Sequence, residues 1–105
     1  MSVTLDITPE QLALVRTILA AHVPADVEVL VFGSRAKGTA KRFSDLNLAL
    51  KGSSALDQRI LNSLADAFEQ SELPWRVDLV DYHSLVPSFL AAVQADLRPL
   101  TIHSG

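Results

Sequence analysis

Apolar residues change their spacing several times along the 105-residue chain, and each change predicts a different element. Between Thr8 and His22 they recur at every third or fourth position, which is typical of an amphipathic helix. Thr8 is a good N-cap and Pro9 suits the first helical position, so we expect this helix to begin there. Pro24 should end it.

Three later segments have the pattern of β-strands. Val27–Phe32 is short and nearly all apolar, as in a central strand. Asp45–Lys51 alternates between apolar and polar residues, so we expect one of its faces to be buried and the other to be wet. Trp75–Tyr82 is the third strand. We expect these strands to be neighbours in one mixed sheet.

Two further helices are expected, the first with Ser54 as its N-cap. Its buried face steps by four residues along Leu56, Ile60, Leu64 and Phe68. The second helix begins at Pro87, and its expected buried stripe is Leu90, Val93 and Leu97. A short strand is expected at Leu100–Ile102. This order predicts an α/β (α+β) fold in which helices lie on one face of a small mixed sheet.

Size and composition exclude several classes of protein. A chain of 105 residues fits a single domain over residues 1–105, and 49% hydrophobic residues exclude global disorder. The absence of cysteine excludes disulfides and thiolate metal sites, and fits a cytoplasmic protein. No apolar run approaches the roughly 20 residues that a membrane-spanning helix needs. A net charge of −3 argues against general nucleic-acid binding.

The end of the first predicted strand has the chemistry of a phosphate site. Gly33 allows a tight turn and the close approach of a ligand. A helical turn that starts at Ser34 would add free N–H groups and a hydroxyl. Four of the nine basic residues follow within eight positions: Arg35, Lys37, Lys41 and Arg42. Taken singly, such a turn and such a basic loop are common and need no ligand, but together they would complement a polyphosphate.

Strand parity brings three oxygen-bearing side chains to one face. Asp45 and Asn47 are two residues apart on a strand, so they point the same way. In the third strand Val77 and Leu79 are the better core pair, which leaves Asp78 on the face of Asp45 and Asn47. Magnesium prefers hard oxygen ligands and usually shares them with substrate phosphates. We therefore expect Asp45, Asn47 and Asp78 to form a magnesium site.

The whole pattern resembles the minimal nucleotidyltransferase family, a branch of the DNA polymerase beta-like nucleotidyltransferases. It comprises Gly33-Ser34, ten residues, Asp45-Leu46-Asn47, and then Asp78 in a later strand. The segments VFGSRAKGTAKRFSDLNLAL and LPWRVDLVDYHSL resemble the family's strand–loop–strand and third-strand segments. The resemblance spans residues 8–102 and implies a polymerase beta-like palm fold.

The resemblance also implies roles for these residues. Gly33 and Ser34 would hold the nucleotide phosphates, with Arg35 and Lys37 beside them. Asp45 would hold magnesium, and Asp78 would help to hold it and activate the attacking hydroxyl. The family has Asp at the position of Asn47, which brings no charge and is a poor bridge between two metals. The chain is thus either a degenerate member or one that carries an Asp-to-Asn change.

Two functions from different classes follow from the resemblance. As an enzyme, the chain would transfer AMP from Mg-ATP to a hydroxyl on a protein, as an antitoxin paired with a helical HEPN-domain toxin. As a binding module, it would neutralise the HEPN toxin by complex formation alone. A small-molecule adenylyltransferase is a weaker alternative, because those enzymes normally carry an added helical domain. A homo-oligomer is compatible with both the enzyme and the binding module.

Overall fold

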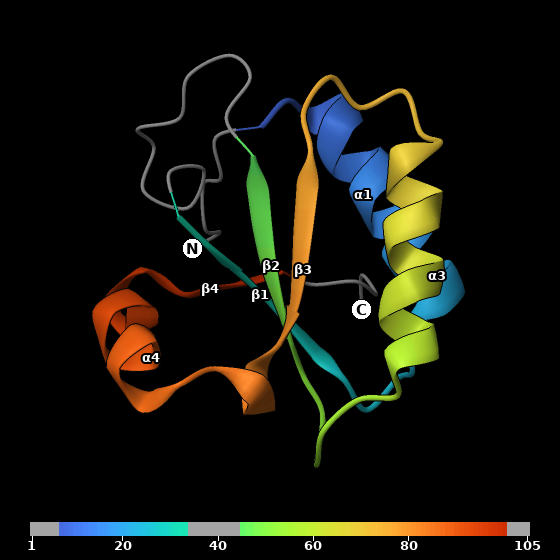
Figure 1. Cartoon of the computed structure of the whole chain (residues 1–105). Coiled ribbons are helices and arrows are strands. Elements are labelled where there is room, and N and C mark those ends of the chain that lie inside the picture. The colour runs from blue at the N-terminus through green and yellow to red at the C-terminus, as the bar shows by residue number, and fades with distance from the viewer. Residues whose placement is uncertain (1–6, 34–44, 101–105) are drawn as a thin grey trace.

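The computed structural model describes residues 7–33 and 45–100, which form one mixed α/β unit (Figure 1). The elements are α1 (Pro9–His22), β1 (Glu28–Phe32), β2 (Leu46–Lys51), α3 (Gln58–Glu69), β3 (Val77–Asp81), η1 (Tyr82–Ser84), α4 (Pro87–Val93), η2 (Gln94–Asp96) and β4 (Arg98–Leu100). None of the helices in these residues is long and apolar enough to span a bilayer.

The four strands form one sheet in the order β3-β2-β1-β4. β1 pairs antiparallel with both β2 and β4, whereas β2 pairs parallel with β3. The sheet is therefore mixed, as expected, and the three strands predicted as neighbours lie side by side. β1 and β2 are the inner strands, which explains why β1 is apolar on both faces.

The two longer helices cover one face of the sheet (Figure 1). Alternate residues of the strands point into the core on that face, where they meet α1 and α3. The largest fully buried side chains are Leu19, Leu46, Leu48, Leu50, Leu64, Val15, Val29 and Val31. Val77 and Leu79 pack against this cluster from β3, as strand parity predicted.

A second, smaller apolar cluster lies on the opposite face. Leu30, Phe32 and Ala49 are buried there, and Val93 and Leu97 pack against them from the segment of α4 and η2. The rings of Phe32 and Phe89 meet edge to face, with centroids 6.0 Å apart. The polar side chains of Asn47 and Asp78 lie on this second face as well.

The first helix begins as the sequence predicts. The Thr8 hydroxyl accepts from the N–H of Gln11 at 3.1 Å, and the Gln11 side chain accepts from the N–H of Thr8 at 3.0 Å. This reciprocal pair is a capping box, with Pro9 at the first helical position.

The predicted cap of α3 is wrong. Asp57, not Ser54, is the N-cap, because its carboxylate accepts from the N–H of Arg59 at 2.9 Å. Leu56 therefore lies outside the helix, although it still packs on the core.

The Arg59 backbone N–H, and then its side chain, lower the pKa of the exposed Asp57 carboxyl. Because the folded-state pKa is lowered, this cap stabilises the helix at neutral pH and is lost as pH falls through that lowered pKa.

The last two elements also differ from expectation. α4 ends at Val93, a 3₁₀ turn follows, and no residue of α4 is buried. A helix of seven residues is too short to bury a stripe, so Leu90, Val93 and Leu97 are only half-buried. The final strand is Arg98–Leu100, not Leu100–Ile102, and residues 101–105 lie outside the described part. As an edge strand, β4 tolerates Pro99.

A buried carboxylate ties β3 to the loop before α3. Asp81 is 8% exposed, and its two oxygens accept from the N–H of Leu56 at 2.9 Å and from the N–H of His83 at 3.1 Å. The Asp81→Ala variant would leave both donors without this partner, so we expect it to lose about 2–3 kcal/mol of unfolding free energy. Urea denaturation measures this. Asp66→Ala on the exposed side of α3 is the control and should change stability by less than about 0.5 kcal/mol.

Candidate functional site

Three adjacent strands carry the predicted site residues to one end of the sheet. Gly33 follows the last residue of β1, where Phe32 pairs with Asn47. Asn47 in turn pairs with Asp78 in the parallel ladder of β2 and β3. Neighbouring strands are about 4.8 Å apart, so Asn47 and Asp78 are direct neighbours across the sheet.

Asp45 joins this pair from the residue before β2. The Leu46 N–H donates to the Arg76 carbonyl at 2.9 Å, so the parallel pairing reaches this point of the chain. Asp45 and Asn47 are two residues apart, about 6.6 Å along a strand. Combined with the strand spacing, this places the α-carbons of Asp45 and Asp78 about 8 Å apart, within reach of one shared metal centre.

The three side chains share the face opposite to the main core. Asp45, Asn47 and Asp78 are half-buried, whereas Leu46 and Leu48 between them are fully buried on the other face. In residues 7–33 and 45–100, no hydrogen bond or ion pair engages the carboxylates of Asp45 and Asp78. Their oxygens are thus available to a ligand.

Gly33 is fitted closely to Asn47. Its φ of +84° lies in the left-handed region, which glycine adopts without steric cost. A Cβ at this position would lie 2.5 Å from Nδ2 of Asn47. The sequence predicted the tight turn, but the group that approaches the Gly33 backbone is the Asn47 amide.

This arrangement suits a magnesium ion. All donors are hard oxygen atoms, two from carboxylates and one from an amide. The Asn47 amide directs its nitrogen at Gly33, so its oxygen is directed away from the turn. Among the described residues no three His, Cys, Asp or Glu come together, because the third donor here is an asparagine. The set fits the metal, with one negative charge fewer than three carboxylates would supply.

The predicted phosphate-binding residues cannot be placed, and one charged residue near the site was not predicted. The residues predicted to bind phosphate after Gly33 lie outside the described part, as do the two further basic residues: Ser34, Arg35, Lys37, Lys41 and Arg42. Sequence reasoning missed Arg76, which is exposed and shares the strand parity of Asp78. The signal was its spacing of two from Asp78. Arg76 places a positive charge directly before the first residue of β3, next to the Asp45 side of the site.

The contact between Gly33 and Asn47 leads to a testable prediction. Gly33→Ala is expected to lose at least about 2 kcal/mol of unfolding free energy, because a left-handed backbone costs about 1–2 kcal/mol and Asn47 must also move. In an Asn47→Ala background only the backbone cost should remain. Urea denaturation of the four proteins in this cycle measures the difference. Equal losses in the two backgrounds would show that the two residues do not interact.

Comparison with known proteins identifies the family of the chain. Residues 17–101 match the family described as polymerase beta, nucleotidyltransferase. The chain belongs to this family. It is 49% identical over 85 residues to the probable protein adenylyltransferase MntA of Haemophilus influenzae, an alignment that covers 81% of this chain and 74% of that protein.

Solved structures show the same fold. A toxin–antitoxin crystal structure with AMP-PNP matches with a TM-score of 0.65 and 26% identity, covering 86% of this chain and 72% of that one. A mutant MntA-HpeT toxin–antitoxin complex matches with a TM-score of 0.68 and 25% identity, covering 90% and 73%. The MNT antitoxin bound to a tri-AMPylated HEPN toxin of Shewanella oneidensis matches at 0.55 and 21% identity, covering 86% and 71%, which shows the fold.

Proposed function

We propose that this chain is an antitoxin that transfers AMP from Mg-ATP to a hydroxyl on a helical HEPN-domain toxin. The observation that carries the proposal is that Gly33 directly follows β1 while Asn47 and Asp78 pair on the adjacent strands β2 and β3, with Asp45 beside them. The 49% identity to a probable protein adenylyltransferase supports the reaction type. The matches to toxin–antitoxin complexes support the kind of partner. We place the pair in the cytoplasm, where ATP is available.

In this reaction the acceptor oxygen attacks the α-phosphorus of ATP. A new O–P bond forms, the bond from the α-phosphorus to the α,β-bridging oxygen breaks, and pyrophosphate leaves. Asp78 accepts the proton of the acceptor hydroxyl. Asp45, Asn47 and Asp78 would hold the metal ion, which when bound neutralises charge on the phosphates. The turn at Gly33 lies on the other side of Asn47, where the nucleotide phosphates would lie against backbone N–H groups.

The alternative is an antitoxin that acts by binding alone. The observation that favours it is Asn47 itself: its amide packs against Gly33 and replaces a charge that two-metal catalysis uses. In that case the chain keeps its toxin-binding surface and does not need the reaction.

Labelling of the toxin separates the two functions. The chain is incubated with a candidate HEPN-domain protein, α-labelled ATP and magnesium, and labelled protein is measured. We expect transfer that is lost when EDTA removes the metal, because the phosphates then lose their counter-charge. A tight complex without any labelled toxin would contradict the enzyme and favour the binding module.

A further inference from the structure

The outer edge of β3 carries free backbone groups next to the site. The Leu46 N–H donates to the Arg76 carbonyl, and Asn47 pairs with Asp78. In a parallel ladder every second residue directs both its N–H and its C=O to the same neighbour. Asp78 therefore bonds to β2, whereas Val77 and Leu79 direct their groups away from it. Within the described residues, no hydrogen bond to these outer groups is formed.

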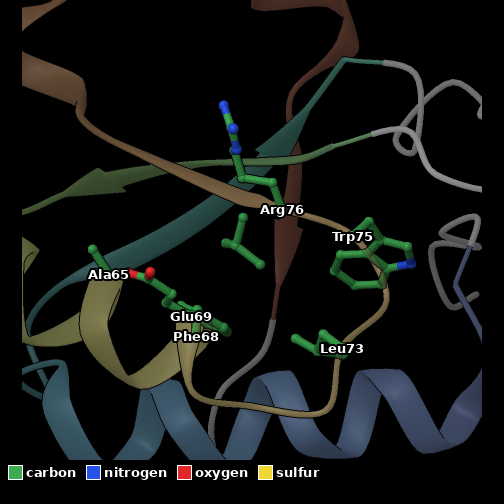
Figure 2. A pocket seen from close by; sticks show the side chains of 7 residues that line it. Ala65, Phe68, Glu69, Leu73, Trp75 and Arg76 are labelled. Carbon is green, nitrogen blue, oxygen red and sulfur yellow. The ribbon is translucent and has the colours of Figure 1, made fainter.

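A hollow of about 460 Å³ lies beside the beginning of the same strand (Figure 2). It is formed between the C-terminal half of α3, the following loop and the start of β3. The lining residues are Ala65, Phe68, Glu69, Leu73, Trp75, Arg76 and Val77. Five of these seven residues are apolar, and the two charged ones, Glu69 and Arg76, are exposed and add polar surface to its rim. In Figure 2 the Arg76 side chain points away from Leu73 and Phe68, toward the other side of the sheet.

We propose that the acceptor protein docks as an extended segment along the β3 edge, with its hydroxyl residue beside Asp78 and an apolar side chain in the hollow. The identity of the docked segment as the acceptor rests on the proposed function, whereas the free edge of β3 and the hollow are features of the fold itself. Side chains of an added strand alternate between the two faces of the sheet. A residue opposite Asp78 would have its Cβ about 5 Å from that of Asp78, on the site face.

The neighbours of that residue would point to the helix-covered face. The hollow lies on this face, beside the first residues of β3. An apolar residue of the docked segment that is one or three positions from the hydroxyl residue would therefore reach the hollow. Two features on opposite faces thus select the same strand register. The exposed Arg76, two residues before Asp78, would favour an acidic residue near the hydroxyl.

The order of the strands explains why the acceptor enters here. Gly33, Asn47 and Asp78 follow one another from β1 to β3, and β3 is the edge of the sheet. The nucleotide phosphates lie at the β1 side in the proposed reaction, so the β3 side is left for the acceptor. The backbone N–H and C=O groups of Val77 and Leu79 that point away from β2 could pair with an extended segment of the acceptor, because a strand offers donors and acceptors at the same spacing.

Hydrogen exchange in the intact complex tests the edge. In the complex with the HEPN-domain protein, the amides of Val77 and Leu79 should exchange at least tenfold more slowly than in the free chain. The amides of Asp78 and Val80, which bond to β2 in both states, are internal controls. Unchanged exchange at Val77 and Leu79 in a formed complex would overturn the proposal.

Filling the hollow tests the second contact. Ala65 is exposed on α3 and lines the hollow, and Ser63 is exposed on the same helix outside it. Ala65→Trp should raise the KM for the toxin at least tenfold without changing ATP affinity, whereas Ser63→Trp should change neither. A normal KM for Ala65→Trp would overturn the docking mode. If neither the chain nor its Asn47→Asp variant labels the toxin, the proposed reaction fails, while the exchange measurement still decides on the edge.

Discussion

The substitution Asn47→Asp should increase the rate of nucleotidyl transfer about 100-fold, equivalent to about 2.7 kcal/mol of transition-state stabilisation. Asp adds a full negative charge between Asp45 and Asp78 and can bridge two metal ions, which an amide does poorly. The position tolerates the change, because Asn47 is half-buried on the site face and Asn and Asp are nearly isosteric. Magnesium affinity should rise with the rate.

Labelling of the HEPN-domain protein with α-labelled ATP measures this gain, with the chain and its variant compared at equal magnesium. Asn62→Asp is the matched control, since it makes the same chemical change on the exposed surface of α3. Strong and equal labelling by the chain and by Asn47→Asp would show that Asn47 is not the second metal ligand. Equal affinity for the toxin in both forms is expected, because position 47 lies inside the site and not on the β3 edge.

Strand parity predicted on which face of the sheet the candidate site residues lie. The alternation of apolar and polar residues after Asp45 predicted which face of β2 packs on the main core, and the pair Val77 and Leu79 predicted the face of β3. The other face of β2 is not wet throughout, contrary to expectation, because Ala49 is buried in the second cluster. A shift of one residue would reverse these faces, so the apolar residues are enough to place Asp78 and Asn47 on the same face, whereas their direct pairing depends on the register of β2 against β3. The tight turn at Gly33 was likewise predictable, because a glycine ends an apolar strand there, and its φ is positive.

Tertiary contacts decided what the sequence left open. Ser54 and Asp57 are equally good caps by residue type, and the structure uses Asp57 while Asp81 binds the N–H of the preceding Leu56. That bond joins residues 25 positions apart, so no local pattern reveals it. The contact between Gly33 and the Asn47 amide is of the same kind, since it depends on the register of β1 against β2.

The edge position of β3 was also beyond the local pattern. An apolar alternation shows which face of a strand is buried, but not whether a further strand follows it in the sheet. Val77 to Val80 are all only half-buried, whereas Leu46, Leu48, Ala49 and Leu50 of β2 are fully buried. Only the assembled sheet shows that Asp78 belongs to the outermost of the described strands, which the proposed docking of the acceptor requires.

Removal of the proposed base should have the largest effect of any single change. Asp78→Asn is expected to lower the rate of nucleotidyl transfer by about 10²–10⁴-fold, the range that general-base catalysis contributes. The amide keeps the size of the side chain and one oxygen ligand, but it cannot accept the proton of the acceptor hydroxyl. The loss should therefore fall mainly on kcat, while the binding of Mg-ATP weakens only slightly.

Asp45→Asn is the matched comparison, because it neutralises the other carboxylate of the same site. It should act mainly on the metal-dependent binding of ATP, measured by calorimetry with and without magnesium. Neither variant should change unfolding in urea by more than about 0.5 kcal/mol, since neither carboxylate forms a hydrogen bond within the described residues. If Asp78→Asn transferred AMP at the rate of the unchanged chain, Asp78 would not be the base. The proton of the acceptor would then leave through another group, and the alignment of the acceptor segment with Asp78 would lose its chemical reason.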